Sequence, residues 1–190
     1  MVTSRSQARL LFARNFFRYP KVLGSLVPSS PFLVDQVLRH IDWGSARVVV
    51  EYGPGVGTFT REILRRMRQD AQLVAIELNA DFVEYLGARY QDPRLHVFRG
   101  SALEVDTCLR ALSHSEADAI VSGIPFSTIS LDVRERILSK SSQVLGPGGR
   151  FLVYQFSRAV LPHLRENFRE IREEFVPLNI LPARIYRCTK

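Results

Sequence analysis

Runs of apolar residues recur along the chain with the spacing of alternating strands and helices. Val48–Val50 is a continuous β-branched run, which is typical of a strand buried on both faces of a parallel sheet. Further strands are predicted at Val74–Leu78, Leu95–Phe98, Ala117–Val121, Gly149–Phe156, Glu170–Val176 and Ala183–Cys188. Between them, apolar residues at helical spacing predict helices from Phe59 to Met67, at Asp81–Arg89 and at Leu161–Phe168, and a longer helix that begins with Ser130–Leu138 and ends before Gly146. This alternation predicts one α/β domain with helices on both faces of the sheet.

Two helical segments are predicted before the first strand. The first, within residues 1–20, has aromatic side chains on one arc and arginines opposite, and it ends at Pro20. This amphipathic pattern is typical of a helix in a membrane interface, and it equally fits a helix packed over its own sheet. Residues 21–45 form a connection and a second helix, with Ser29 or Ser30 as its cap and Pro31 as its first residue. Its predicted inward-facing residues are Phe32, Leu33, Val37, Leu38 and Ile41, and it is expected to end around Gly44.

The turn after Val48–Val50 reads E-Y-G-P-G-V-G-T and carries the clearest chemical signal in the chain. Its glycines, Gly53, Gly55 and Gly57, let the backbone approach a ligand closely, because no Cβ stands in the way. Thr58 is predicted to cap the helix that follows. Small ligands bind at the carboxyl ends of the strands in open α/β sheets, so a small-molecule site is expected at this turn.

Two acidic residues accompany this turn. Glu51 follows the first strand, where it would face a phosphate group badly but would suit an ammonium group. Glu77 lies twenty residues after Gly57 at the end of the second strand, placed to accept hydrogen bonds from a ribose diol. A tight turn without a ligand, beside a solvated Glu77, is the plainer alternative.

The glycine turn and the acid that follows it resemble those of the class I S-adenosylmethionine (SAM) methyltransferases. The resemblance covers Val48 to about Ile185 and implies a Rossmann-like, seven-stranded sheet of order 3-2-1-4-5-7-6 with strand seven antiparallel. It also implies SAM as the cofactor, no metal, and residues 46–190 as the SAM-binding core. The implied cofactor-binding residues are Ser30, Glu51, Gly53, Gly55, Gly57, Thr58, Glu77, Leu78, Ser101, Ala102, Leu103 and Ser122.

One position departs from this family's pattern after the third strand. Methyltransferases of this type usually have Gly-Asp-Ala there, and the acid binds the exocyclic amine of adenine. This chain has Gly100-Ser101-Ala102 instead. A serine hydroxyl accepts the same hydrogen bond without a charge, so a weaker contact with adenine is expected.

The fourth strand runs into S-G-I-P-F, at Ser122–Phe126, where this fold places the reactive methyl group. Adenine-N6 methyltransferases carry N/D-P-P-Y or N-L-P-Y at this place, and their first side chain and the proline-turn carbonyl grip the amino group of the base. Here Ser122 replaces the amide or acid and Phe126 replaces the tyrosine, which argues against adenine as the substrate. The predicted catalytic residues are Ser122, Gly123, Ile124, Pro125, Phe126 and Tyr19.

Together with the segments Phe16–Ser30 and Leu178–Tyr186, these motifs resemble bacterial phospholipid N-methyltransferases, which are related to rRNA adenine dimethylases. The resemblance implies stepwise methylation of phosphatidylethanolamine by SAM toward phosphatidylcholine. Aromatic faces suit the cation that forms on the amine, and the candidate walls are Phe126, Tyr19, Tyr154 and Phe156. Main-chain carbonyls at Gly123 and Ile124 are expected to orient the amine, and the arginines and lysine Arg14, Arg18 and Lys21 to meet the membrane and the lipid phosphate. An rRNA adenine or small-molecule N-methyltransferase and a non-catalytic lipid- or SAM-binding module remain as alternatives.

The charge and composition of the chain limit the classes of binding partner. The net charge is +7, and only three of the 26 basic residues are lysines. Arginine suits phosphate, so nucleic acid and lipid head groups are both candidates, although a high-GC genome would produce the same bias. Cys108 and Cys188 lie far apart and indicate neither a metal site nor a disulfide framework. With no long apolar run and no signal peptide, we expect a cytoplasmic protein at the inner face of the membrane, with phospholipid rather than nucleic acid as its partner.

Overall fold

The structure, a computed structural model, describes residues 29–179 and 181–190. The predicted helix within residues 1–20, together with Arg14, Arg18, Tyr19 and Lys21, lies outside the described residues. Within the described ranges, no helix has the length and apolar character needed to cross a membrane.

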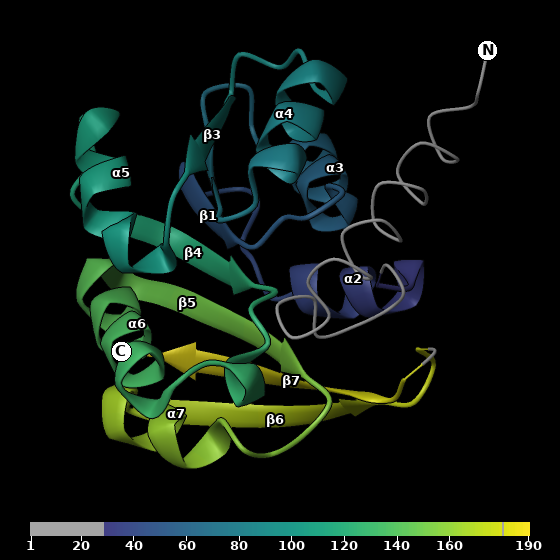
Figure 1. Ribbon diagram of the computed structural model, residues 1–190, viewed down its shortest axis with the longest axis vertical. Coiled ribbons are helices and arrows are strands. Elements are labelled where there is room, and N and C mark those ends of the chain that lie inside the picture. Colours follow the sequence, from purple (N-terminus) through teal and green to yellow (C-terminus); the bar gives the residue numbers. More distant parts are fainter. Residues whose placement is uncertain (1–28, 180) are drawn as a thin grey trace.

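The centre of the fold is a seven-stranded sheet of order β3-β2-β1-β4-β5-β7-β6, the order that the sequence resemblance implies. The strand β1 pairs in parallel with both β2 and β4, whereas β7 runs antiparallel between β5 and β6 (Figure 1). The predicted fold class, a Rossmann-like sheet with one antiparallel strand, is therefore confirmed. The strands are β1 (Val48–Tyr52), β2 (Gln72–Glu77), β3 (Leu95–Arg99), β4 (Ala117–Ser122), β5 (Leu145–Gln155), β6 (Glu170–Val176) and β7 (Ala183–Thr189).

Helices cover both faces of the sheet, as the apolar pattern predicts. Successive strand residues point to opposite faces, so Val49 packs with α2 and α3 while Val48 and Val50 pack with α5, α6 and α7. Helix α4 lies beside α3 (Figure 1). The helices are α2 (Pro31–Leu38), α3 (Thr58–Arg66), α4 (Ala80–Arg89), α5 (Val105–Ala111), α6 (Leu131–Val144) and α7 (Leu161–Asn167), with 3₁₀ turns η1 (Ala102–Glu104) and η2 (Phe126–Thr128).

Helix α2 follows the prediction at its start and departs from it afterwards. Ser30 is the N-cap, and its Oγ accepts a hydrogen bond from the N–H of Leu33 at 3.1 Å. The helix ends at Leu38 rather than around Gly44. The prediction that Phe32 faces inward is wrong, because its side chain at the first turn is 41% exposed.

The start of α3 and the start of β5 also differ from the predicted ones. Thr58 does not cap α3: it is the first helical residue, and the N-cap is Gly57, which takes a left-handed φ of 76°. Helix α6 ends at Val144, before Gly146 as predicted, but β5 already begins at Leu145 rather than at Gly149. A register shift between β4 and β5 accommodates these extra β5 residues.

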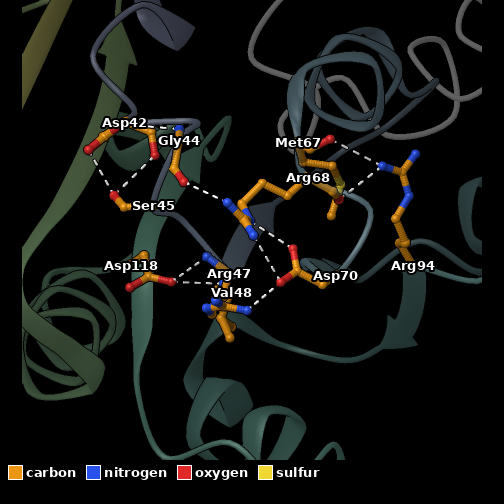
Figure 2. A network of polar contacts seen from close by, with 10 residues as sticks. All are labelled: Asp42, Gly44, Ser45, Arg47, Val48, Met67, Arg68, Asp70, Arg94 and Asp118. Atoms are coloured by element: carbon orange, nitrogen blue, oxygen red, sulfur yellow. Dashed lines mark hydrogen bonds and ion pairs between the residues drawn. The ribbon is translucent and has the colours of Figure 1, made fainter.

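Polar contacts fix the edge of the sheet at which the parallel strands begin, which we call the amino edge (Figure 2). The carboxylate of Asp118, on β4, accepts hydrogen bonds from the N–H groups of Arg47 and Val48 at 2.7 and 2.8 Å, so the starts of β4 and β1 are tied together. The guanidinium of Arg94 donates to the carbonyls of Met67 and Arg68 and thereby caps the end of α3. These contacts hold the strand starts in place, and with them the strand ends at the opposite edge.

Candidate active site

A cavity of about 690 Å³ lies at the carboxyl edge, where β1 to β5 end. This volume is in the usual range for small-molecule sites. Turns from five strands meet there, so residues far apart in the sequence share one wall. The residues predicted from the sequence that line the cavity are Glu51, Gly53, Gly55, Thr58, Glu77, Leu78, Ser101, Ala102, Gly123, Ile124, Pro125, Tyr154 and Phe156.

The three glycines of the turn divide into two roles. Gly53 and Gly55 line the cavity at φ values of 65° and 56°, and a Cβ on Gly55 would meet no atom within 4 Å. Gly57 does not line it, which corrects its predicted role. A Cβ on Gly57 would lie 2.7 Å from the ring of Tyr90 and 2.9 Å from the side chain of Leu86, so this glycine lets α3 approach α4.

Glu77 ends β2 with its side chain fixed by backbone groups. Its two carboxylate oxygens accept hydrogen bonds from the N–H of Gly55 at 3.0 Å and the N–H of Asn79 at 2.9 Å. The residue is only 7% exposed, and burial raises the pKa of the carboxyl group while these hydrogen bonds lower it. Each oxygen keeps a second lone pair. A fixed pair of acceptors at this edge matches the two hydroxyls of a ribose.

Glu51 is the more deeply buried acid, at 2% exposure, and it lines the same cavity. The hydroxyl of Thr60 donates a hydrogen bond to one of its carboxylate oxygens at 2.7 Å. Desolvation raises the pKa of the Glu51 carboxyl group to about 8, and the nearby Glu77 adds to the rise. Glu51 has no cationic partner among the ion pairs of the described residues. A cationic ligand in the cavity would therefore stabilise the ionised form of its carboxyl group.

The segment after β3 forms the far wall of the cavity. Ser101 caps η1. Its Oγ accepts a hydrogen bond from the N–H of Leu103 at 3.2 Å, and the backbone N–H of Ser101 donates to the carboxylate of Glu104. Ser101 and Ala102 line the cavity, and so does Leu78, which is 64% exposed. Leu103 does not line the cavity, and its side chain packs against the core.

The segment after β4 also contains both cavity-lining and buried residues. Gly123, Ile124 and Pro125 line the cavity, but Ser122 and Phe126 are fully buried and do not. The Oγ of Ser122 faces inward and accepts from the N–H of Ile124 at 3.4 Å. The turn η2 directs Phe126 into the hydrophobic core, so the predicted aromatic wall at Phe126 is wrong.

Ser30 is also not a cavity residue. Its hydroxyl caps α2 and donates to the carbonyl of Leu178 at 3.1 Å, while the neighbouring Ser29 lines the cavity. The side chain of Ser29 is hydrogen-bonded to the hydroxyl of Tyr154, whose pKa is raised by burial to about 12.

Two of the cavity residues that were not predicted make specific contacts with predicted ones. The ring of Phe59 stacks on that of Tyr154, with centroids 4.9 Å apart and planes at 16°. Gln155 is 6% exposed, and its Nε2 donates to the carbonyls of Ile124 at 2.8 Å and Tyr154 at 2.7 Å. A polar amide inside the apolar run of β5 is the signal that could have identified Gln155.

Away from the cavity, three potential metal ligands converge. Glu135 on α6 and His163 and Glu166 on α7 have ligand atoms within 4.8 Å of one another. Both glutamates are exposed, and none of the three residues lines the cavity.

This sheet order with a cavity over the glycine turn is the architecture of the class I SAM-dependent methyltransferases, and the chain is one of them. Precorrin-6y C5,15-methyltransferase from Geobacter metallireducens has the same fold, with a TM-score of 0.66 at 15% identity over 84% of this chain and 86% of that one. Residues 18–159 match the family model described as ribosomal RNA adenine dimethylase, and the chain belongs to that family.

Two relatives show how the similarity is distributed. An ornithine lipid N-methyltransferase of Singulisphaera acidiphila is 32% identical over 94% of this chain and 94% of its own length. A ribosomal RNA small subunit methyltransferase A of Laribacter hongkongensis is also 32% identical, but over 50% of this chain and 35% of its own length. The similarity to the lipid enzyme therefore extends over nearly the full chain, whereas that to the rRNA enzyme covers part of each protein.

The cavity fits the cofactor of the class. Glu77 would hold the ribose hydroxyls of SAM. Gly53 and Gly55 would let the methionine part of SAM lie close to the backbone, and the buried Glu51 would face the positive charges of the cofactor. When bound, SAM supplies a methyl group on a sulfonium centre. Ser101, Ala102 and Leu78 are left for the adenine ring, with a hydroxyl in place of the usual acid.

Proposed function

We propose that the protein transfers methyl groups from SAM to the amine of a membrane lipid head group, with phosphatidylethanolamine as substrate and products leading to phosphatidylcholine. The observation that carries this proposal is the full-length similarity to an ornithine lipid N-methyltransferase. The absence of a base-gripping side chain supports it, because Ser122 is buried and its hydroxyl is directed at a backbone N–H.

The residues after β4 and β5 would orient the amine. The nitrogen must present its lone pair to the methyl carbon in line with the breaking carbon–sulfur bond. The backbone carbonyl at Gly123 would accept from a remaining N–H group. The Ile124 carbonyl already accepts from Gln155 Nε2 and from the N–H of Phe126, which fixes the turn. Each transfer makes the nitrogen cationic. After the first two transfers the ammonium releases an N–H proton to solvent, whereas the third would leave a permanently charged quaternary ammonium. The ring faces of Tyr154 and Phe156 suit that cation.

Ornithine lipid is the second candidate substrate. Ornithine carries a primary amine at the end of a flexible chain, as ethanolamine does, and the relative that matches nearly the full chain is named for it. An rRNA adenine remains the alternative that the family model and the net charge of +7 favour.

One experiment separates these substrates. The purified chain is incubated with methyl-labelled SAM and, in parallel, with vesicles containing phosphatidylethanolamine, vesicles containing ornithine lipid, and small ribosomal subunits. We expect label in the phosphatidylethanolamine fraction. Label only in ornithine lipid would move the substrate to that lipid, and label only in RNA would overturn the proposal.

A matched pair of variants makes the labelling result specific to the cavity. Glu77→Ala removes the ribose acceptor and is expected to abolish labelling. Glu84→Ala removes an exposed glutamate of α4 outside the cavity and is expected to leave labelling unchanged. Equal labelling by both variants would contradict the assigned site.

The proposed location is the inner face of the cell membrane, with the protein held peripherally. The amphipathic sequence of residues 1–20 and the arginine-rich composition support this location. Deleting residues 1–20 is expected to weaken vesicle binding while leaving SAM binding largely intact. Unchanged vesicle co-sedimentation after the deletion would exclude that segment as an anchor.

A further inference from the structure

Exposed apolar side chains gather at one edge of the described molecule. Single exposed apolar residues are ordinary on protein surfaces, but a cluster of them is informative. Every large hydrophobic side chain that is exposed in the described residues lies at or just after the end of a parallel strand, in the β6–β7 connection, or at the start of a helix at the same edge. They are Phe32, Leu78, Leu131, Phe156, Phe175, Leu178 and Leu181. All therefore lie at the carboxyl edge, around the cavity.

Four of these residues lie at the adjacent ends of β5, β7 and β6, and we call them the hairpin face: Phe156 after β5, Phe175 near the end of β6, and Leu178 and Leu181 in the connection between β6 and β7. The three hairpin residues are 56%, 66% and 50% exposed, respectively. Phe156 and Leu181 also line the cavity, so the hairpin face continues into its mouth. The carbonyl of Leu178 accepts a hydrogen bond from Ser30, which ties the hairpin turn to the start of α2.

Arginines stand directly behind this apolar surface. The guanidinium of Arg184 lies 5.3 Å from the ring centroid of Phe175. Arg184 and Arg158 both pair with the single carboxylate of Glu173, so this group carries one excess positive charge. Apolar side chains in front of arginines are the arrangement that suits a lipid interface, where the chains enter the acyl boundary and the cations meet phosphates.

The opposite edge provides the contrast. At the amino edge, Arg47, Arg68, Asp70 and Asp118 form a network of hydrogen bonds and ion pairs (Figure 2). None of the exposed large hydrophobic residues of the described ranges lies there. The two edges of one sheet thus differ in the way expected if only the carboxyl edge meets an apolar phase.

We propose that the hairpin face is a membrane-docking surface that inserts into the head-group layer of a phospholipid bilayer and holds the cavity mouth against it. The inference rests on the proposed lipid substrate. A lipid amine then enters between Phe156 and Leu181 while its acyl chains stay in the bilayer, so the protein need not extract the whole lipid. The residues of this surface all lie outside residues 1–20, whose contribution the deletion described above measures.

The position of the hairpin relative to lipid can be measured by fluorescence. Trp43 is the single tryptophan, and it lies before β1, at the amino edge. In a Trp43→Phe background, Leu178→Trp moves this reporter to the hairpin face. With vesicles of phosphatidylcholine and phosphatidylglycerol that carry brominated acyl chains, we expect strong quenching of the reporter at position 178 and little quenching of Trp43 in the unmodified chain. Equal, weak quenching at both positions with the protein vesicle-bound would overturn the proposal, and so would a reporter already shielded from water without vesicles, which would show that another segment of the chain covers the face.

Charge variants test the energetic role of the same surface. Phe175→Glu with Leu178→Glu places two acids on the hairpin face outside the cavity lining, and Gln91→Glu with Gln143→Glu adds the same charge to exposed positions near the amino edge. We expect the first pair to lower the vesicle partition coefficient by about tenfold or more relative to the second, since two apolar insertions are lost. Both pairs should bind S-adenosylhomocysteine like the unmodified chain, which reports that the fold is intact. Equal partitioning of the two pairs would overturn the docking surface.

Turnover separates this inference from the proposed function. The hairpin pair should methylate a short-chain, water-soluble phosphatidylethanolamine as well as the control pair does, yet lose methylation of vesicle lipid. Loss of vesicle binding by the hairpin pair without lipid methylation by any form of the chain would overturn the proposed function and leave the docking surface standing. Vesicle methylation that is equal in both pairs would overturn the docking surface and leave the proposed function standing.

Discussion

The hydroxyl of Tyr154 lies in the space that a side chain at Gly123 would need. A Cβ built on Gly123 would be 2.8 Å from this hydroxyl oxygen and 3.1 Å from the carbonyl oxygen of Gly53. Tyr154, on β5, and Gly123, directly after the neighbouring strand β4, both line the cavity. The phenol of Tyr154 therefore fills the space beside Gly123, at the point where the methyl acceptor is expected.

The first prediction concerns this contact. Gly123→Ala should lower kcat for lipid methylation by about tenfold to a hundredfold, because the new methyl group displaces Tyr154 or the turn. Adding Tyr154→Phe removes the clashing oxygen and should restore part of the lost rate. Steady-state kinetics with labelled SAM and vesicles measure both variants.

The double variant also supplies the control. Tyr154→Phe alone keeps the stack on Phe59 and loses the hydrogen bond with Ser29, so its own effect on kcat must be measured first. If the double variant is slower than the product of the two single effects predicts, the two residues do not share one space in the way described.

A second prediction concerns Glu77. Glu77→Gln keeps one acceptor but places an amide N–H₂ against one of the two backbone N–H groups that now donate to the carboxylate. We expect the dissociation constant for S-adenosylhomocysteine to rise about tenfold to a hundredfold, as for the loss of a charged hydrogen-bond acceptor. Isothermal titration calorimetry measures it, with Glu84→Gln on α4 as the control. An unchanged constant would remove Glu77 from the cofactor site.

Much of the fold followed from the sequence because its signals are local. The β-branched run at Val48–Val50 predicts β1, and the motif that continues from it led through the family resemblance to the observed strand order. Boundaries were less well predicted where tertiary pairing extends an element. β5 starts at Leu145 because it pairs with Ala117 across a register shift, and no local pattern indicates that pairing.

The sequence predicted which backbone turns form the site better than it predicted which side chains point into it. Gly53 and Gly55 line the cavity, as strand-end glycines are expected to. Phe126 belongs to the same kind of strand-end motif, yet η2 turns its ring into the core, and the motif alone does not give that direction. Gln155 was missed because its partner carbonyl, at Ile124, lies 31 residues earlier in the chain.

A third prediction tests Gln155 as a positioning residue. Gln155→Leu removes the donor to the Ile124 carbonyl and should let the turn after β4 move. We expect kcat for lipid methylation to fall about tenfold, with the affinity for S-adenosylhomocysteine little changed, because the turn orients the acceptor rather than the cofactor. Gln143→Leu, on the exposed side of α6, is the matched control. A fall in cofactor affinity that is as large as the fall in kcat would point to general loss of structure instead.

The last prediction follows from the pKa of Glu51. Its carboxyl group has a pKa of about 8 in the fold against an ordinary value of 4.5, so between these values the folded state holds a proton that the unfolded state has released. The free energy of unfolding contributed by this group therefore falls by about 1.4 kcal/mol per pH unit as the pH rises across that interval, and the loss levels off above it. Glu51→Gln removes the titration while retaining an acceptor for the Thr60 hydroxyl.

Urea unfolding of the ligand-free protein at a series of pH values from 5 to 9 measures this effect as a difference between variant and unmodified chain. The stability of Glu51→Gln relative to the unmodified chain should rise from pH 5 to about pH 8 and then stay constant, given the pKa of the group. Glu62 provides the opposite case: its hydrogen bond with Arg65 lowers the pKa of its carboxyl group, so its contribution is lost only as the pH falls through the acid range. Glu62→Gln should therefore show no slope relative to the unmodified chain across the same series. A flat difference for Glu51→Gln as well would mean that its carboxyl group is ionised at neutral pH, and that the cavity already compensates its charge before any cationic ligand arrives.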